Sequence, residues 1–159
     1  MHRSAPNPSN RIDTLATHAG DDPFRFMGAV SPPIFETSTF VFPSFADAVA
    51  AFADEQEHCV YTRGRNPTVR VVEEKLAAME GAEACRLFGS GMAAISAAIL
   101  SCVKAGDHVV AVDTAYGPAR ALMTGFLSRF GVSATLVDGR DPAEWESAVR
   151  PNTALFYLE

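Results

Sequence analysis

The residues best suited to chemistry lie in a glycine turn, Phe88-Gly89-Ser90-Gly91-Met92-Ala93-Ala94. Glycines let the backbone approach an anion closely, and a helix amino end presents free N–H groups at the positive end of its dipole. The turn therefore predicts a phosphate site built from backbone amides, with the Ser90 hydroxyl as a further donor. A plain tight turn between a strand and a helix is the structural alternative.

The same turn also fits a second functional reading. Gly89, Gly91 and Ala94 have the spacing of a dinucleotide-binding fingerprint with alanine in its last place. The next predicted strand ends at Asp113, whose carboxylate could hold a ribose hydroxyl. Taken alone, these residues indicate a nicotinamide or flavin enzyme, so other segments must decide between the two readings.

An upstream loop, Tyr61-Thr62-Arg63-Gly64-Arg65-Asn66-Pro67-Thr68, places two guanidinium groups and a phenol before a predicted helix. Arginine holds phosphate well through paired hydrogen bonds. The structural alternative is a solvated loop followed by a helix cap. A dinucleotide domain begins at the strand before its glycine turn, so it leaves this arginine-bearing segment unexplained.

Tyr116 follows a predicted strand directly, within Asp113-Thr114-Ala115-Tyr116-Gly117-Pro118. Open α/β sheets bind ligands at the carboxyl ends of their strands. An aromatic ring there can stack on a flat cofactor ring, or it can simply cover the sheet edge.

From residue 66 onwards the chain alternates between helix and strand patterns, which is typical of an α/β fold with a mostly parallel sheet. Predicted helices cover 67–79, 93–103, 119–130 and 142–149, and predicted strands cover 84–88, 109–112, 133–137 and 154–158. Residues 1–60 contain many prolines and look irregular, apart from a short helix over 45–53 capped by Ser44. An apolar arm of this kind is expected to lie on the rest of the domain or on a second subunit.

The composition excludes several partners. A net charge of −6 argues against nucleic acid, whose phosphate backbone needs a basic face. The longest apolar stretch, 92–103, is much shorter than the roughly 20 residues that span a bilayer. The three cysteines form no CxxC pair, as expected for a reduced chain, so a cytoplasmic protein is predicted.

Taken together, these segments resemble the amino-terminal part of the cysteine/methionine-metabolism family of pyridoxal-phosphate enzymes, which includes cystathionine γ-synthases, cystathionine lyases, methionine γ-lyases and homoserine-ester sulfhydrylases. The resemblance extends over nearly the whole chain, and its matches are 17–20, 29–34, 37–40, 61–68, 80–83, 90–94, 105–107, 116–117 and 157–159. It implies an aspartate-aminotransferase-like fold (fold type I), with an amino-terminal arm over 1–60 that contacts a partner subunit and part of the α/β large domain over 61–159.

The resemblance also implies roles for single residues. Tyr61 and Arg63 would reach the cofactor phosphate of a neighbouring subunit, in a homodimer or homotetramer of the parent enzyme. The backbone of Gly91 and Met92, together with Ser90, would hold the phosphate of the same subunit.

The catalytic role falls to Tyr116. Its ring would stack on the pyridine ring of pyridoxal 5'-phosphate, and its phenol could assist proton transfer to or from an amino-acid substrate.

Other parts of the family site lie beyond Glu159: the lysine that links to the cofactor, the aspartate that pairs with the pyridine nitrogen, and the arginine that grips the substrate carboxylate. Lys75 and Lys104 match none of these positions and are expected to be solvated surface residues. A truncated and inert piece of a trans-sulfuration enzyme is therefore predicted. A non-catalytic protein that binds the cofactor or associates with subunits is the alternative. Pro118 stands where methionine γ-lyases typically carry a cysteine, which weighs against that activity.

Overall fold

The computed structural model describes residues 11–55 and 57–159. The chain divides into two compact units, residues 1–87 (unit 1) and 88–159 (unit 2), and each is described by itself. The sequence instead predicts a division of the chain at residue 60, into an arm that contacts a partner subunit and a part that binds the cofactor, and this division stays a prediction. Residues 1–10 of the predicted arm lie outside the described residues. No helix among the described residues is long and apolar enough to cross a membrane.

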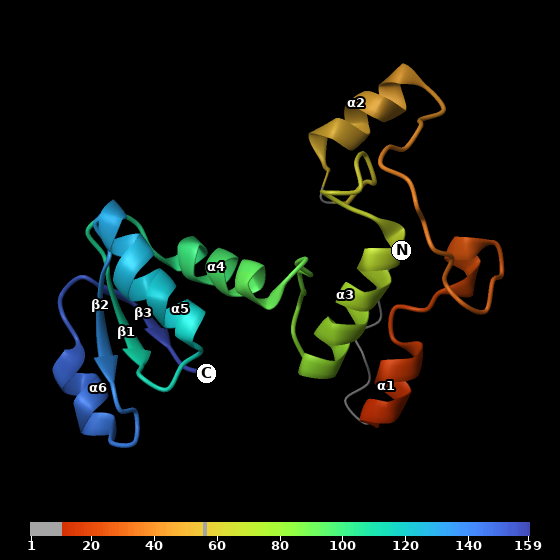
Figure 1. Cartoon of the computed structure of the whole chain (residues 1–159). Helices are drawn as coiled ribbons and strands as arrows, with labels where there is room; N and C mark the ends of the chain where they lie inside the picture. The colour runs from red at the N-terminus through yellow and green to blue at the C-terminus, as the bar shows by residue number, and fades with distance from the viewer. Residues whose placement is uncertain (1–10, 56) are drawn as a thin grey trace. The chain divides into compact units, whose positions relative to one another are not determined.

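Unit 2 is built on a parallel sheet of three strands, β1 (His108–Val112), β2 (Ser133–Val137) and β3 (Thr153–Tyr157), in the order β2-β1-β3 (Figure 1). The first four residues of the central strand β1 are fully buried, as expected for a parallel strand that is covered on both faces. The predicted mostly parallel α/β sheet is therefore confirmed.

The helices of unit 2 are α4 (Gly91–Cys102), α5 (Gly117–Ala121) and α6 (Pro142–Ala148), with a π-helical turn η2 (Leu122–Phe126) and a 3-10 turn η3 (Leu127–Phe130). The hydrophobic core joins α4, β1 and the turns that follow α5. Its buried members are Ile99, Val109, Ala111, Met123, Leu127 and Val132.

The segment 119–130 is helical, but the prediction of one regular helix is wrong, because the segment changes from α to π to 3-10 geometry. Gly125 lowers helix propensity in its middle. The hydroxyls of Thr124 and Ser128 also donate to the carbonyls of Arg120 and Gly125, at 2.8 and 2.6 Å. Such side-chain bonds compete with the regular helical ladder.

The predicted strand over 84–88 is also wrong. The segment has no regular secondary structure, and none of the described strands pairs with it. Instead, the backbone N–H of Leu87 donates to the carboxylate of Glu73 at 3.0 Å. An apolar run is thus insufficient to make a strand where no neighbouring strand lies within reach.

Unit 1 contains α1 (Ile12–His18), the 3-10 turn η1 (Pro23–Phe26), α2 (Phe45–Ala53) and α3 (Pro67–Glu80). The arm is therefore less irregular than its prolines predicted. The bounds of α2 and its Ser44 cap are confirmed, since the Ser44 hydroxyl accepts from the N–H of Asp47 at 3.1 Å.

Helix α3 begins at Pro67, with Asn66 as its cap, and ends at Gly81. Gly81 has a φ of 64°, a left-handed conformation that glycine adopts without a steric penalty. Lys75 on α3 is not the solvated residue predicted. Its side chain is 20% exposed, and its ammonium lies 2.9 Å from the Asp21 carboxylate, which ties the chain after α1 to α3.

A buried histidine crosses the sheet of unit 2 at the amino end of β1. His108 is 0% exposed, and its ring nitrogens lie 2.8 Å from the Thr153 hydroxyl on β3 and 2.9 Å from the Thr135 hydroxyl on β2. Burial, and secondarily the charge of Arg150, lowers the pKa of His108. The imidazole therefore stays neutral in the folded chain at pH values where an unfolded histidine takes up a proton.

The folded chain thus binds fewer protons than the unfolded chain below about pH 6.5, the ordinary histidine pKa. The free energy of unfolding should be highest above that pH and fall as the pH decreases towards about 5. His108→Gln keeps a donor and an acceptor but cannot titrate, so its urea-unfolding free energy should vary less with pH over this range. An equal pH dependence in the variant and the wild type would contradict this account of His108.

Candidate functional site

The amino end of α4 carries the predicted phosphate turn. Ser90 is the cap of α4, and its hydroxyl oxygen accepts from the N–H of Ala93 at 3.1 Å. The N–H of Ala94 donates to the Ser90 carbonyl at 3.1 Å. Among the described residues, the N–H groups of Gly91 and Met92 have no acceptor, so they remain available to a ligand together with the Ser90 hydroxyl proton.

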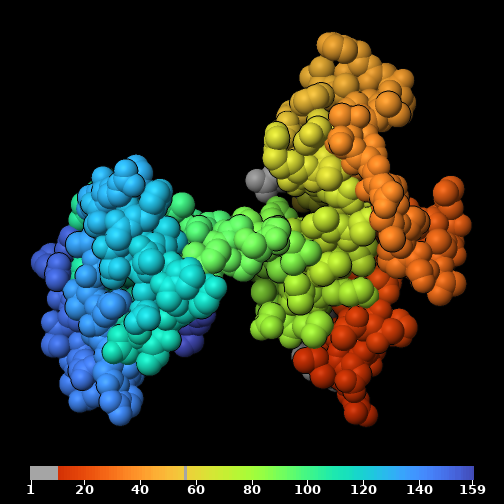
Figure 2. Space-filling model, in the orientation of Figure 1, coloured from red at the N-terminus to blue at the C-terminus, as the bar shows by residue number. Residues whose placement is uncertain are grey.

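The space around this turn is open within unit 2. A Cβ atom placed on Gly89 or Gly91 would meet no atom within 4 Å. Both glycines and Ser90 are exposed, and Figure 2 shows α4 on the visible surface of unit 2. The two glycines therefore leave room beside the turn within unit 2.

Tyr116 lies at the carboxyl edge of the sheet, as predicted. It caps α5 just past the end of β1, and its side chain is exposed. Its backbone N–H donates to the carboxylate of Glu159 at 3.1 Å. Glu159 follows β3, and because β1 and β3 are parallel neighbours, the residues that follow them meet at one edge.

Sequence reasoning missed the role of Glu159. The same carboxylate oxygen accepts from the Tyr157 hydroxyl at 2.8 Å. Burial, and then the hydrogen bond and charge of Glu159, raises the pKa of Tyr157. The position of Glu159 directly after an apolar strand was the signal that could have revealed it, because strand ends in parallel sheets gather at one edge.

Arg120 holds the other side of the Tyr116 turn. Its guanidinium donates to the carbonyl of Asp113 at 2.7 Å, so the chain between β1 and α5 is closed from the helix side. The backbone carbonyl of Asp113 therefore helps to hold this turn. The dinucleotide hypothesis concerns a different group of the same residue, the carboxylate that would bind a ribose hydroxyl.

Tyr61 and Arg63 lie together in unit 1. The Arg63 guanidinium carbon is 5.1 Å from the centre of the Tyr61 ring, in a cation–π arrangement. Both side chains project from a tight loop in which the N–H groups of Gly64 and Arg65 donate to the Tyr61 carbonyl at 2.9 and 3.1 Å. The Tyr61 side chain is 43% exposed, so this pair can meet a ligand or another chain.

The structure thus brings the predicted residues together in two groups. Ser90 caps α4, whose first two residues are Gly91 and Met92, and Tyr116 lies in the same unit as the cap of α5, which packs against α4. Tyr61 and Arg63 form the second group in unit 1.

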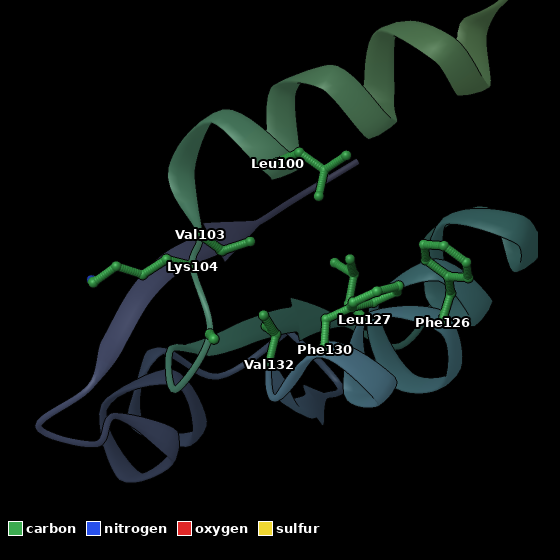
Figure 3. A pocket seen from close by; sticks show the side chains of 8 residues that line it. Leu100, Val103, Lys104, Phe126, Leu127, Phe130 and Val132 are labelled. Atoms are coloured by element: carbon green, nitrogen blue, oxygen red, sulfur yellow. The ribbon is translucent and has the colours of Figure 1, made fainter.

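An apolar groove of about 300 Å³ in unit 2 includes none of the predicted site residues (Figure 3). It is lined by Leu100, Val103, Lys104, Ala105, Phe126, Leu127, Phe130 and Val132. The ammonium of Lys104 pairs with Asp107 at 3.0 Å, so this lysine stabilises a turn at the far end of α4 from the phosphate turn.

The chain matches the Cys/Met metabolism PLP-dependent enzyme family over residues 13–159. It is 51% identical to an L-methionine gamma-lyase from Porphyromonas gingivalis over 146 residues, which are 92% of this chain and 36% of that protein. It is 42% identical to an O-succinylhomoserine sulfhydrylase from Pseudomonas aeruginosa, over 93% of this chain and 36% of the relative.

A solved structure agrees with these sequence matches. The crystal structure of the metY protein from Campylobacter jejuni superposes with a TM-score of 0.86 at 29% identity, over 94% of this chain and 37% of that one. That structure contains a pyridoxyl-lysine monophosphate. The chain spans little more than a third of the length of these proteins, and it belongs to the Cys/Met metabolism family of PLP-dependent enzymes.

Proposed function

We propose that this chain supplies the phosphate-binding turn and the ring-stacking tyrosine of a pyridoxal-phosphate enzyme of trans-sulfuration. One observation carries the proposal: the N–H groups of Gly91 and Met92 lack acceptors among the described residues, and a Cβ atom placed on Gly91 would meet no atom within 4 Å. A helix amino end with free N–H groups favours a dianionic phosphate. The donor set therefore fits the phosphate of the cofactor that this family uses.

Each residue has a distinct task in the proposed site. Gly91 and Met92 donate their backbone N–H groups to phosphate oxygens. Ser90 adds its hydroxyl proton, while its oxygen stays bonded to Ala93. Tyr116 offers an exposed ring for stacking and a phenol that can hold or move a proton near the sheet edge.

When bound, pyridoxal phosphate supplies an electron-accepting ring that stabilises negative charge on an amino-acid substrate. In the proposed reaction, a group is expelled or replaced at the γ carbon of a homoserine ester, cystathionine or a related substrate. Glu159 accepts from the backbone N–H of Tyr116, and Arg120 donates to the carbonyl of Asp113, so both restrain the turn that carries Tyr116.

Tyr61 and Arg63 are proposed to serve the phosphate of a neighbouring subunit in a cytoplasmic homodimer or homotetramer. Their exposure within unit 1 supports a role outside their own unit. Arginine is suited to this task because its planar guanidinium binds two phosphate oxygens at once.

Substrate choice within the family remains part of the proposal. The relatives include proteins named methionine gamma-lyase and O-succinylhomoserine sulfhydrylase. Pro118 is the one residue of this chain that weighs against the lyase, and high identity to the lyases weighs in its favour. The common element of these proposed reactions is the departure of a group from the γ carbon of the amino-acid substrate.

Gly91→Ala should separate cofactor binding from folding. A methyl group at this position meets open space, so the midpoint of thermal unfolding should not fall. The same methyl group would stand where the phosphate approaches, so affinity for pyridoxal phosphate, measured by equilibrium dialysis, should fall at least about tenfold, as expected for loss of a charge-assisted hydrogen bond. Gly125→Ala, also in open space but on η2, is the matched control and should bind as the wild type does. Equal affinities of the two variants would refute the phosphate site.

The 159-residue chain alone should show no turnover. Both of its lysines are engaged in ion pairs, Lys75 with Asp21 and Lys104 with Asp107, and neither lies in the phosphate turn. Incubation with pyridoxal phosphate and methionine or an O-acylhomoserine should release neither oxoacid nor thioether above the level of cofactor alone. Turnover above that level would overturn the claim. Cofactor binding without turnover is equally expected of the second candidate, a non-catalytic binding or subunit-association protein, for which this chain's free N–H groups suffice.

A further inference from the structure

Asn66 is a polar side chain that is almost fully buried in unit 1, with an exposure of 4%. We infer that Asn66 is a positioning residue that fixes the loop carrying Tyr61 and Arg63 against the extended segment 33–40. What that loop does for a ligand rests on the proposed function, while its positioning by Asn66 rests on the contacts below.

All the polar atoms of the Asn66 amide are used. Its Nδ2 donates to the carbonyl of Phe35 and to the hydroxyl of Thr62, both at 3.0 Å. Its Oδ1 accepts from the N–H of Thr68 at 2.9 Å. A carbonyl can only accept and a backbone N–H can only donate, so these partners fix the orientation of the amide.

Thr62 connects Asn66 to the loop that carries Tyr61 and Arg63. It stands between Tyr61 and Arg63, and its hydroxyl donates to the Thr37 carbonyl while it accepts from Asn66. Its backbone N–H donates to the carbonyl of Ser38 at 2.9 Å. These hydrogen bonds of Thr62 therefore restrain the backbone of the two residues that flank it.

The extended segment is held from the same place. The N–H of Phe35 donates to the Thr68 hydroxyl at 2.9 Å, and that hydroxyl donates to the Pro33 carbonyl at 3.2 Å. Thr39 and Tyr61 form an isolated antiparallel bridge. Segment 33–40 and loop 60–68 thus lie side by side, and they are orange and yellow in Figure 2.

Helix capping alone does not require asparagine here. Serine, threonine or aspartate can also accept from the second or third N–H of a helix. Only an amide can accept from Thr68 and also donate twice from the same side chain. Since an unsatisfied buried donor or acceptor is costly, the choice of asparagine indicates that the two donations to Phe35 and Thr62 are needed.

Asn66→Asp tests this directly, because it keeps the acceptor that caps α3 and turns the donor into an acceptor. In the full chain, residue-resolved hydrogen exchange at the N–H groups of Phe40 and Thr62 should accelerate about 25-fold, since each of the two lost hydrogen bonds should contribute roughly fivefold. Exchange inside α3 should change less than about twofold. Asn152→Asp is the matched control, because Asn152 makes one amide donation, to Gly106 in unit 2. Unchanged exchange at Phe40 and Thr62 in Asn66→Asp would overturn the inference.

A second pair of variants decides the matter if Asn66→Asp does not fold. Thr62→Val removes the acceptor of the Asn66 amide, whereas Thr62→Ser retains a hydroxyl. The valine variant should accelerate exchange at Phe40, and the serine variant should restore it to near the wild-type rate. Equal exchange rates at Phe40 in the two variants would show that the pairing of loop 60–68 with segment 33–40 does not depend on the Thr62 hydroxyl, which contradicts the inference.

Cofactor affinity separates this inference from the proposed function. If Asn66 acts through the loop, Asn66→Asp should weaken pyridoxal-phosphate binding, and it should add nothing once Tyr61→Phe and Arg63→Ala are both present. Effects that still multiply in this combined variant would overturn the positioning role. An Arg63→Ala variant that binds as the wild type does would instead overturn the phosphate role of Arg63, and the exchange rates would still decide the role of Asn66.

Discussion

The parallel pairing of β1 with both β2 and β3 is the constraint on which unit 2 depends. β1 pairs with strands on both sides, its pairing with β3 shifts register between His108 and Val109, and the His108 ring lies within hydrogen-bond distance of threonines on both neighbours. Parallel strands gather their carboxyl ends at one edge. The turn with Tyr116 and the residue Glu159 meet there for this reason, and their hydrogen bond joins β1 to β3 beyond the sheet itself.

The phosphate turn depends on a different physical feature, the unfilled bonding capacity of a helix amino end. Ser90 satisfies the third N–H of α4 through its side chain, and the first two are left open. Unit 1 offers the complementary chemistry of a guanidinium stacked on a phenol. Neutral amide donors and a cationic fork are both ordinary ways to bind phosphate, so each unit carries a set of groups with that chemistry.

Local signals in the sequence were sufficient for much of this fold. Caps and breakers such as Ser44, Asn66 and Gly81 act within a few residues, so the ends of α2 and α3 could be predicted closely. The segment 84–88 could not, because a strand depends on a partner that local sequence does not reveal. Likewise, the ion pair of Lys75 with Asp21 joins residues far apart in the sequence, so local patterns predict a solvated lysine instead.

Within the candidate site, the same distinction holds. The locations of the Ser90–Met92 turn and of Tyr116 could be predicted, because both lie next to the beginning of a predicted helix. The structure places them at the amino ends of α4 and α5. The bonds of Glu159 to Tyr116 and of Asn66 to Phe35 connect residues 43 and 31 positions apart, and no local pattern predicts them. The resemblance to a known family assigned roles to residues, but the contacts that hold those residues in place required coordinates.

The most direct test of the central claim is an NMR titration of the chain with pyridoxal phosphate, following the backbone amide signals of unit 2. Because their N–H groups are free of acceptors among the described residues, the signals of Gly91 and Met92 should shift saturably and by the largest amounts. Titration with pyridoxal, which lacks the phosphate, should leave them nearly unchanged. Saturable binding that shifts other residues and leaves Gly91 and Met92 in place would contradict the account.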